Sequence, residues 1–155
     1  MKGQEAIIGT LNNLLADELT AINQYMVHSE MCADWGYARL HESVEKRAIT
    51  EMKHAERLIG RILFLEGKPT VSKLNRISIG GDVEAQFRSD LAAEAAAIGS
   101  YNAAVQQAAE LVDNGTRDLL QSILNDEEDH LDWLESQLDQ IAQMGIQTYL
   151  SEQTG

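Results

Sequence analysis

The stretch EMKHAERLIGRILFLEG, residues 51–67, places a Glu three residues ahead of a His at the start of an apolar stripe. Side chains three and four residues apart lie on one face of an α-helix, so Glu51 and His54 share a face with Leu58 and Ile62. A helix normally turns that apolar face toward the core of the protein. The stretch therefore predicts an amphipathic helix that carries an acid and an imidazole on its buried side.

Helical patterns cover most of the 155 residues, as four long segments and one short one. The expected helices span about residues 4–34, 39–65, 83–111, 116–145 and 146–152. Asp82 and Thr116 are the expected N-caps of the third and fourth helices. The connection from Gly67 to Gly81 has 15 residues, enough to travel the length of a bundle, so the second and third helices can run parallel. We predict one all-α domain, residues 1–155, forming an antiparallel four-helix bundle with one long crossover and a short fifth helix.

The two halves of the chain repeat each other with an offset of 76 residues. LLADELTAI at 14–22 aligns with DLAAEAAAI at 90–98, and the Glu-x-x-His of 51–54 aligns with that of 127–130. This self-similarity predicts a duplicated helix hairpin, which gives the bundle an internal pseudo-two-fold axis.

Six polar side chains interrupt the apolar stripes of the four long helices. They are Glu18, Glu51, His54, Glu94, Glu127 and His130. Burying an unpaired carboxylate costs several kcal/mol, so four of them in one core must either hold protons or bind metal. Two divalent cations balance four carboxylates when both His are neutral, and oxygen with imidazole ligands suits iron, manganese or zinc. We predict a dinuclear metal site; a metal-free bundle with a buried acid cluster is the alternative.

Composition excludes several classes of function. The net charge of −13 argues against a nucleic-acid partner, which requires basic patches. No stretch approaches the ~18 apolar residues of a membrane span, and the N-terminus lacks the apolar region of a signal peptide. The single cysteine, Cys32, cannot form an internal disulfide, so a reducing, cytoplasmic location is expected. Glu128, Asp129 and Asp132 leave the apolar stripe and are expected on a solvated face.

Several motifs along the whole chain resemble those of bacterioferritins, the haem-containing branch of the ferritins. They are MKG (1–3), LTAINQY (19–25), DWG (34–36), EMKHAERLIGRILFLEG (51–67), IGGDV (79–83), RSDLA (88–92) and NDEEDHLDWLESQLD (125–139). The resemblance implies a ferritin-like bundle and a hollow homo-oligomeric shell of 24 subunits that stores ferric mineral. It also implies a ferroxidase centre with two iron ions per subunit, where Fe(II) is oxidised by O₂ or hydrogen peroxide.

The same resemblance implies a role for each ligand. Glu18 and Glu94 would be terminal ligands, Glu51 and Glu127 would bridge the irons, and each His, His54 and His130, would bind one iron.

Residues around the ligands carry further expectations. Tyr25 would lend an electron to the centre by resemblance, although a buried core tyrosine is an equal interpretation. Asp126 is placed to orient a ligand His, whereas its repeat partner Thr50 is a weaker orienter. Some bacterioferritins have His and Asp at positions 46 and 50, where they form an inner-surface iron site. This chain has Lys46 and Thr50 instead, so its route for iron or electrons into the cavity stays open.

Met52 lies inside the opening motif but, at 100° per residue, points away from the core face. The resemblance implies that two Met52 side chains from paired subunits ligate one b-type haem, one per two subunits, which assists reductive iron release. The positions near that haem would be Leu19, Ile22, Asn23, Met26 and Ile49. A bacterioferritin-associated ferredoxin would supply the electrons. The alternative for Met52 is ordinary filling of a dimer interface.

Two other functions fit parts of the pattern. One is a rubrerythrin-like di-iron oxidase or peroxidase, which is disfavoured because no Cys-x-x-Cys pair is present. The other is a non-enzymatic helical interaction protein, which is disfavoured by the acids on the buried faces. His28 and His41 have no acidic partner in repeat register and are expected at the surface or an interface. Trp133 is expected to pack beside the metal site.

Overall fold

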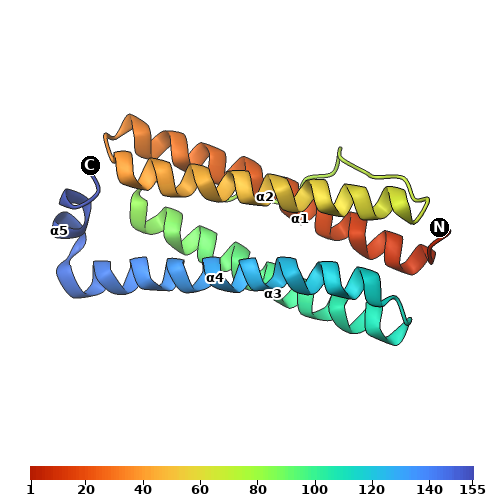
Figure 1. The fold of residues 1–155 in the computed structure, drawn as a ribbon. Coiled ribbons are helices and arrows are strands. Elements are labelled where there is room, and N and C mark those ends of the chain that lie inside the picture. The colour runs from red at the N-terminus through yellow and green to blue at the C-terminus, as the bar shows by residue number, and fades with distance from the viewer.

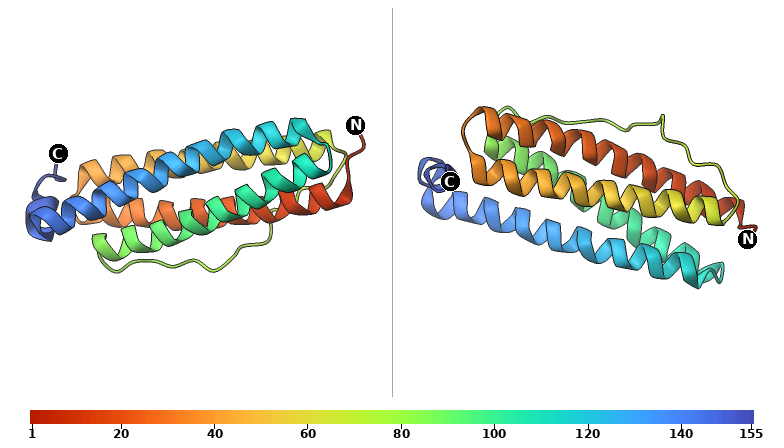
Figure 2. Two further views of the ribbon diagram at one scale, coloured as in Figure 1. Left: turned by 90° about the horizontal axis from the view of Figure 1, so that it is seen from below. Right: turned by 45° about the horizontal axis from the view of Figure 1, so that its top comes forward.

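The computed structural model describes all 155 residues and is built almost entirely of helix (Figure 1). Its elements are α1 (Glu5–Asp34), α2 (Ala38–Phe64), α3 (Val83–Glu110), α4 (Asn114–Met144) and α5 (Ile146–Ser151). α1 pairs with α2, and α3 with α4, as two antiparallel hairpins laid side by side (Figures 1 and 2). The connection after α2 returns along the bundle, so α2 and α3 run in the same direction. The predicted four-helix bundle is confirmed, and no helix has the apolar length that crossing a bilayer requires.

The N-caps of α3 and α4 follow ordinary capping chemistry, but one of them was predicted wrongly. The carboxylate of Asp82 accepts the Ala85 N–H at 2.8 Å, as predicted. α4 begins two residues before Thr116, and its N-cap is Asp113, which accepts the Thr116 N–H at 3.1 Å and the Thr116 hydroxyl at 2.6 Å. Asp113 is also held by Arg61 at 3.0 Å. Asn114 and Gly115, which precede the predicted start of the helix at 116, are therefore its first residues.

The long crossover is fastened to α1 at intervals. Four backbone N–H groups of the crossover donate to side chains of α1. The pairs are Thr70 with Asn12 (2.8 Å), Asn75 with Thr20 (2.8 Å), Ser78 with Gln24 (3.1 Å) and Gly80 with His28 (3.0 Å). At 1.5 Å per residue, the acceptors cover about 24 Å of α1. The crossover is thus held in place along the helix although it has no helix or strand of its own.

The expectation that His28 lies at the surface is wrong. Its side chain is fully buried, with Nδ1 3.0 Å from Asp90 Oδ1. Because Nε2 accepts the Gly80 N–H, the proton of the neutral imidazole sits on Nδ1 and is donated to Asp90. Gln24 also donates to Asp90, at 2.8 Å. This network joins α1, α3 and the crossover. Asp90 was missed because it lies on another helix, where helical spacing from His28 carries no information.

The apolar core has two large clusters, separated by a polar layer, and a small third cluster of Tyr25, Val44 and Ala48. One cluster contains Ile7, Leu11, Leu15, Leu58, Ile62, Tyr101, Leu120 and Ile123. A second cluster, at the other end of the bundle, contains Cys32, Leu40, Val83, Phe87, Leu134, Ile141 and Tyr149. On each long helix the acidic residue of the predicted site falls between the two clusters. The six predicted ligands are therefore closed off at both ends of the bundle by hydrocarbon.

Candidate metal centre

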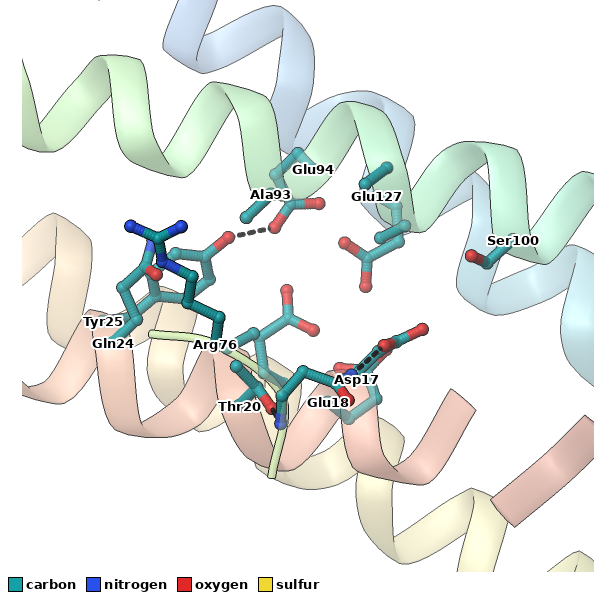
Figure 3. A pocket seen from close by; sticks show the side chains of 15 residues that line it. Asp17, Glu18, Thr20, Gln24, Tyr25, Arg76, Ala93, Glu94, Ser100 and Glu127 are labelled. Atoms are coloured by element: carbon teal, nitrogen blue, oxygen red, sulfur yellow. Dashed lines mark hydrogen bonds between the residues drawn. The ribbon is translucent and has the colours of Figure 1, made fainter. Parts of the chain in front are cut away.

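The structure brings all six predicted ligands together at the middle of the bundle. None of them is more than 7% exposed. They fall into two overlapping groups whose potential ligand atoms lie within 4.8 Å of one another. The first group is Glu18, Glu51, His54 and Glu127, and the second is Glu51, Glu94 and His130. Figure 3 shows Glu18, Glu94 and Glu127 turned toward a common space, and Glu51 belongs to both groups.

The Nδ1 atoms of His54 and His130 both point toward the carboxylates of the site. His54 Nδ1 lies 3.1 Å from Glu51 Oε2 and 3.1 Å from Glu127 Oε1, and His130 Nδ1 lies 2.9 Å from Glu94 Oε1. The far nitrogen of His54, Nε2, lies 2.8 Å from a carboxylate oxygen of Asp126. The predicted contact between Asp126 and one of the two site histidines is therefore present, and it restricts rotation of the His54 ring.

The second imidazole is held differently. The hydroxyl of Thr50, the repeat partner of Asp126, donates to the Lys46 carbonyl at 3.1 Å instead of reaching His130. The His130 ring is stacked on Trp133 with centroids 6.1 Å apart, and the Tyr25 ring meets it edge-on. Trp133 therefore packs against the site, as predicted. Its indole supports the ring by packing alone, which leaves His130 less firmly oriented than His54.

Two buried tyrosines, one from each helix hairpin, contact a glutamate of the other hairpin. The Tyr25 hydroxyl donates to Oε1 of Glu94 (Figure 3), and the Tyr101 hydroxyl donates to Oε1 of Glu18 at 2.6 Å. Each hairpin thus supplies a phenol to the glutamate of the other hairpin that lies outside the Glu-x-x-His motif. Tyr101 was not predicted as a site residue, although its repeat match with Tyr25 was the signal that could have identified it.

Burial shifts the proton affinities of the carboxyls in opposite directions. Burial and the charge of Glu51 raise the pKa of Glu18 well above its usual range. Burial and the contact with Glu94 likewise raise the pKa of Glu127. Burial also acts on Glu51 and Glu94, but hydrogen bonds outweigh it and lower the pKa of both. For His54, burial is outweighed by hydrogen bonds to Glu127, Glu18 and Glu51, which raise its pKa to about 12. In the absence of metal these shifts favour protons on Glu18, Glu127 and His54.

The donor atoms fit a divalent metal. Oε2 of Glu18 and Oε2 of Glu94 are buried without a hydrogen-bond partner. A buried acceptor left in this way costs about 1–3 kcal/mol. One cation in each ligand group would satisfy the free oxygen of that group. Hard carboxylate oxygens with two imidazoles are the ligands that iron, manganese and zinc accept.

A cavity of about 190 Å³ leads to these atoms between α1, α3 and the crossover (Figure 3). All four glutamates line it, and Asn75 and Arg76 of the crossover form part of its wall. Small residues such as Ala93 and Ala97 on α3 leave the space open. An ion can therefore approach the carboxylates from this side of the bundle.

Comparison with known proteins decides the family. The ferritin-like domain family matches residues 8–144. The chain is 40% identical over 149 residues to the bacterioferritin of Brucella melitensis biotype 1, covering 96% of this chain and 92% of the relative. It is 38% identical over 152 residues to the bacterioferritin of Mycolicibacterium paratuberculosis, covering 98% and 96%. The chain belongs to the bacterioferritin family.

Three of the residues that the bacterioferritin resemblance assigns to haem are exposed on α1 and α2. Ile49 and Met52 are three residues apart on one face of α2 and are 43% and 44% exposed. Met26, on α1, is 51% exposed. The other three, Leu19, Ile22 and Asn23, are partly buried on α1. The direction predicted for Met52, away from the core, is confirmed.

Loading this bacterioferritin-family centre with a divalent metal should release about three protons per subunit near pH 7, because ligands bind metal only when deprotonated. The protons come from Glu18, Glu127 and His54, whose pKa values are all raised. Since metal competes with protons here, affinity should rise with pH, by about 10³ per pH unit for the product of the two binding constants. Titrating metal-free protein with two Co(II) per subunit, in weak buffer with a pH indicator, measures the release. A release near zero would mean that the carboxyls are already ionised.

Proposed function

We propose that this protein stores iron, oxidising Fe(II) at the buried centre and holding the product as ferric mineral inside an oligomeric shell. The observation that carries the proposal is the pair of overlapping ligand groups that share Glu51. The family match supports the storage function, because the relatives are named bacterioferritins. In this assignment Glu18 and Glu94 are terminal ligands of the bound Fe(II), Glu51 and Glu127 bridge the two ions, and each His binds one.

The roles of the side chains follow from their contacts. Two ions held by shared carboxylates can give up two electrons together, enough to reduce O₂ to peroxide or hydrogen peroxide to water. Asp126 keeps the Nδ1 of His54 turned toward one ion. The phenols of Tyr25 and Tyr101 each hold one oxygen of a terminal carboxylate and leave its other oxygen free for iron. Tyr25 is in addition the phenol proposed to lend an electron.

Subunit pairing and haem binding are proposed on the outer faces of α1 and α2. Exposed apolar side chains gather on these helices, which is characteristic of a surface that meets a partner. They are Met26, Val27, Ile49, Met52, Leu63 and Phe64. Two copies related by a two-fold axis would place one Met52 thioether on each side of a single haem. The haem, once bound, supplies a one-electron relay for reducing the stored mineral. The proposed electron donor is a bacterioferritin-associated ferredoxin.

The rival di-iron oxidase is less well supported. The cavity at the centre has a volume of about 190 Å³, whereas small-molecule sites commonly have about 300–1,000 Å³. An iron ion needs far less room than an organic substrate. The space at the centre therefore suits Fe(II) and a small oxidant.

Particle size combined with iron uptake tests the proposal. A shell of 24 subunits of 17.2 kDa has a mass of about 410 kDa. We expect sedimentation at that mass and aerobic uptake of far more Fe(II) than two ions per subunit. Anomalous scattering at the iron edge, from crystals soaked in Fe(II), would place the first ions between Glu51 and Glu127. A monomer or dimer that takes up only two ions per subunit would favour the rival function.

A further inference from the structure

The guanidinium of Arg47 contacts Glu51 and Glu127, the two carboxylates that are assigned as bridging ligands. Arg47 stands one helical turn before Glu51 on α2, and its side chain is 13% exposed. Its Nη2 lies 2.7 Å from Glu51 Oε1 and 3.1 Å from Glu127 Oε2. Its Nε donates to Glu51 Oε1 at 2.8 Å, and its Nη1 donates to the Asp126 carbonyl at 3.2 Å. The sequence analysis did not identify Arg47, although its i, i+4 spacing to Glu51 was a visible signal.

The oxygens that Arg47 holds belong to one side of the centre. A carboxylate that bridges two ions gives one oxygen to each. His54 faces Oε2 of Glu51 and Oε1 of Glu127, so those oxygens belong with the ion that His54 binds. The opposite oxygen of each bridge is the one that Arg47 holds. Arg47 therefore occupies the oxygens needed by the second ion, which Glu94 and His130 would complete.

The duplicated motif does not require this cation. The residue 76 positions after Arg47 is Ile123, which is fully buried in the apolar core. The α1–α2 hairpin has a charged Arg47 at this position of the repeat, and the α3–α4 hairpin has the apolar Ile123. Packing alone does not explain the guanidinium, because an aliphatic side chain serves at the same position of the other hairpin.

There is room for the guanidinium to leave. A second cavity, lined by Arg47, Lys46, Thr50, His130 and Trp133 among others, opens on the α2 and α4 side. The cavity described above opens on the α1 and α3 side and reaches the same carboxylates. Arg47 lines the second cavity and contacts two carboxylates that line the first, so its side chain has space to move into when it releases them.

We propose that Arg47 is a displaceable counter-ion that makes the two metal positions unequal. The inference rests on the proposed two-metal centre. In the metal-free protein Arg47 holds one oxygen each of Glu51 and Glu127, and an ion enters the Glu94 and His130 position only by displacing it. The position completed by Glu18 and His54 keeps its full affinity. The second position binds weakly, which suits an ion that must leave again for the mineral.

Stepwise Co(II) titration of the metal-free assembled protein, followed by calorimetry and by the visible absorption of Co(II), tests the proposal. Arg47→Gln should bind the second ion about 10- to 100-fold more tightly, because charge-assisted hydrogen bonds no longer have to be broken. The first ion should change less than about threefold. Arg57→Gln, which removes an exposed arginine from the same helix, is the matched control and should leave both steps unchanged.

Two further measurements keep the result decisive. Arg47→Lys keeps the charge but cannot fork across two carboxylates, so it should give a smaller gain and provides the test if Arg47→Gln does not assemble. Any loss of thermal stability caused by Arg47→Gln in EDTA should disappear in saturating Co(II), since metal then replaces the counter-ion. A second-step affinity that is unchanged or weaker in both variants would overturn the inference. Failure of the wild-type protein to bind two Co(II) would instead overturn the proposed function.

Discussion

Replacing Glu127 with alanine is expected to slow Fe(II) oxidation by at least about 100-fold while leaving the helices intact. Loss of a residue that merely orients a ligand commonly costs 10- to 100-fold in metal affinity or activity, and Glu127 is assigned as a ligand to both ions. Its carboxylate lies 3.1 Å from His54 Nδ1 and 3.1 Å from Arg47 Nη2. Without it, one ligand group loses an oxygen and the centre loses one of the four charges that balance two Fe(II). Alanine is the best helix former, so α4 should remain folded.

Stopped-flow absorbance after mixing metal-free protein with two Fe(II) per subunit in air gives the rate. Glu128→Ala is the matched control, because Glu128 is the next residue on α4 and is exposed. It should oxidise iron at the wild-type rate. Circular dichroism of both variants should match wild type. Oxidation at an undiminished rate by Glu127→Ala would place the centre elsewhere.

Replacing Met52 with leucine is expected to abolish haem binding altogether. The thioether is the only group of that side chain that can ligate iron, and in the proposed two-fold pairing a single substitution would remove the ligand of both subunits. Leucine has nearly the same volume and apolar character, so the surface that would pair the subunits is preserved. Met52 is exposed and points away from the core, so Fe(II) oxidation should remain.

The b-type haem spectrum of the purified protein, together with its iron oxidation rate and particle size, measures the effect. Met144→Leu is the control, since Met144 is also 44% exposed but lies at the end of α4. That variant should keep one haem per two subunits. Haem retained at this ratio in Met52→Leu would rule out the thioether as the ligand.

The sequence predicted which six polar side chains meet in the core, because helical spacing is nearly a rigid geometry. Glu51 and His54, three residues apart on one helix, must share a face wherever the helix lies. The repeat then predicted that the second pair, Glu127 and His130, and the lone glutamates Glu18 and Glu94 would lie at the same level of the bundle. The reciprocal contacts of Tyr25 and Tyr101 follow from the same register, which pairs the two residues, but only Tyr25 was predicted as a site residue.

Contacts that break the register could not be predicted in this way. The pairing of His28 with Asp90 depends on how closely α1 and α3 approach and on where the crossover passes. Periodicity carries no information on either. Arg47 reaches Glu127 across two helices, which depends on the rotamer of a long side chain. At the start of α4, Asp113 and Thr116 are both good capping residues, and the side chain of Asp113 binds Arg61 as well.

The crossover that joins the two hairpins has a consequence for how the centre can change during evolution. Two separate copies of one hairpin would be encoded by one gene, so any arginine gained at position 47 would appear twice. Both bridging carboxylates would then face two guanidinium groups, and the two metal positions would remain identical. Because the crossover makes the hairpins one chain, fastened along α1, each half can mutate independently. Joining the two hairpins in one chain thus allows two related ligand sets to diverge. In the proposed centre, one metal position would then retain iron tightly while the other would release it.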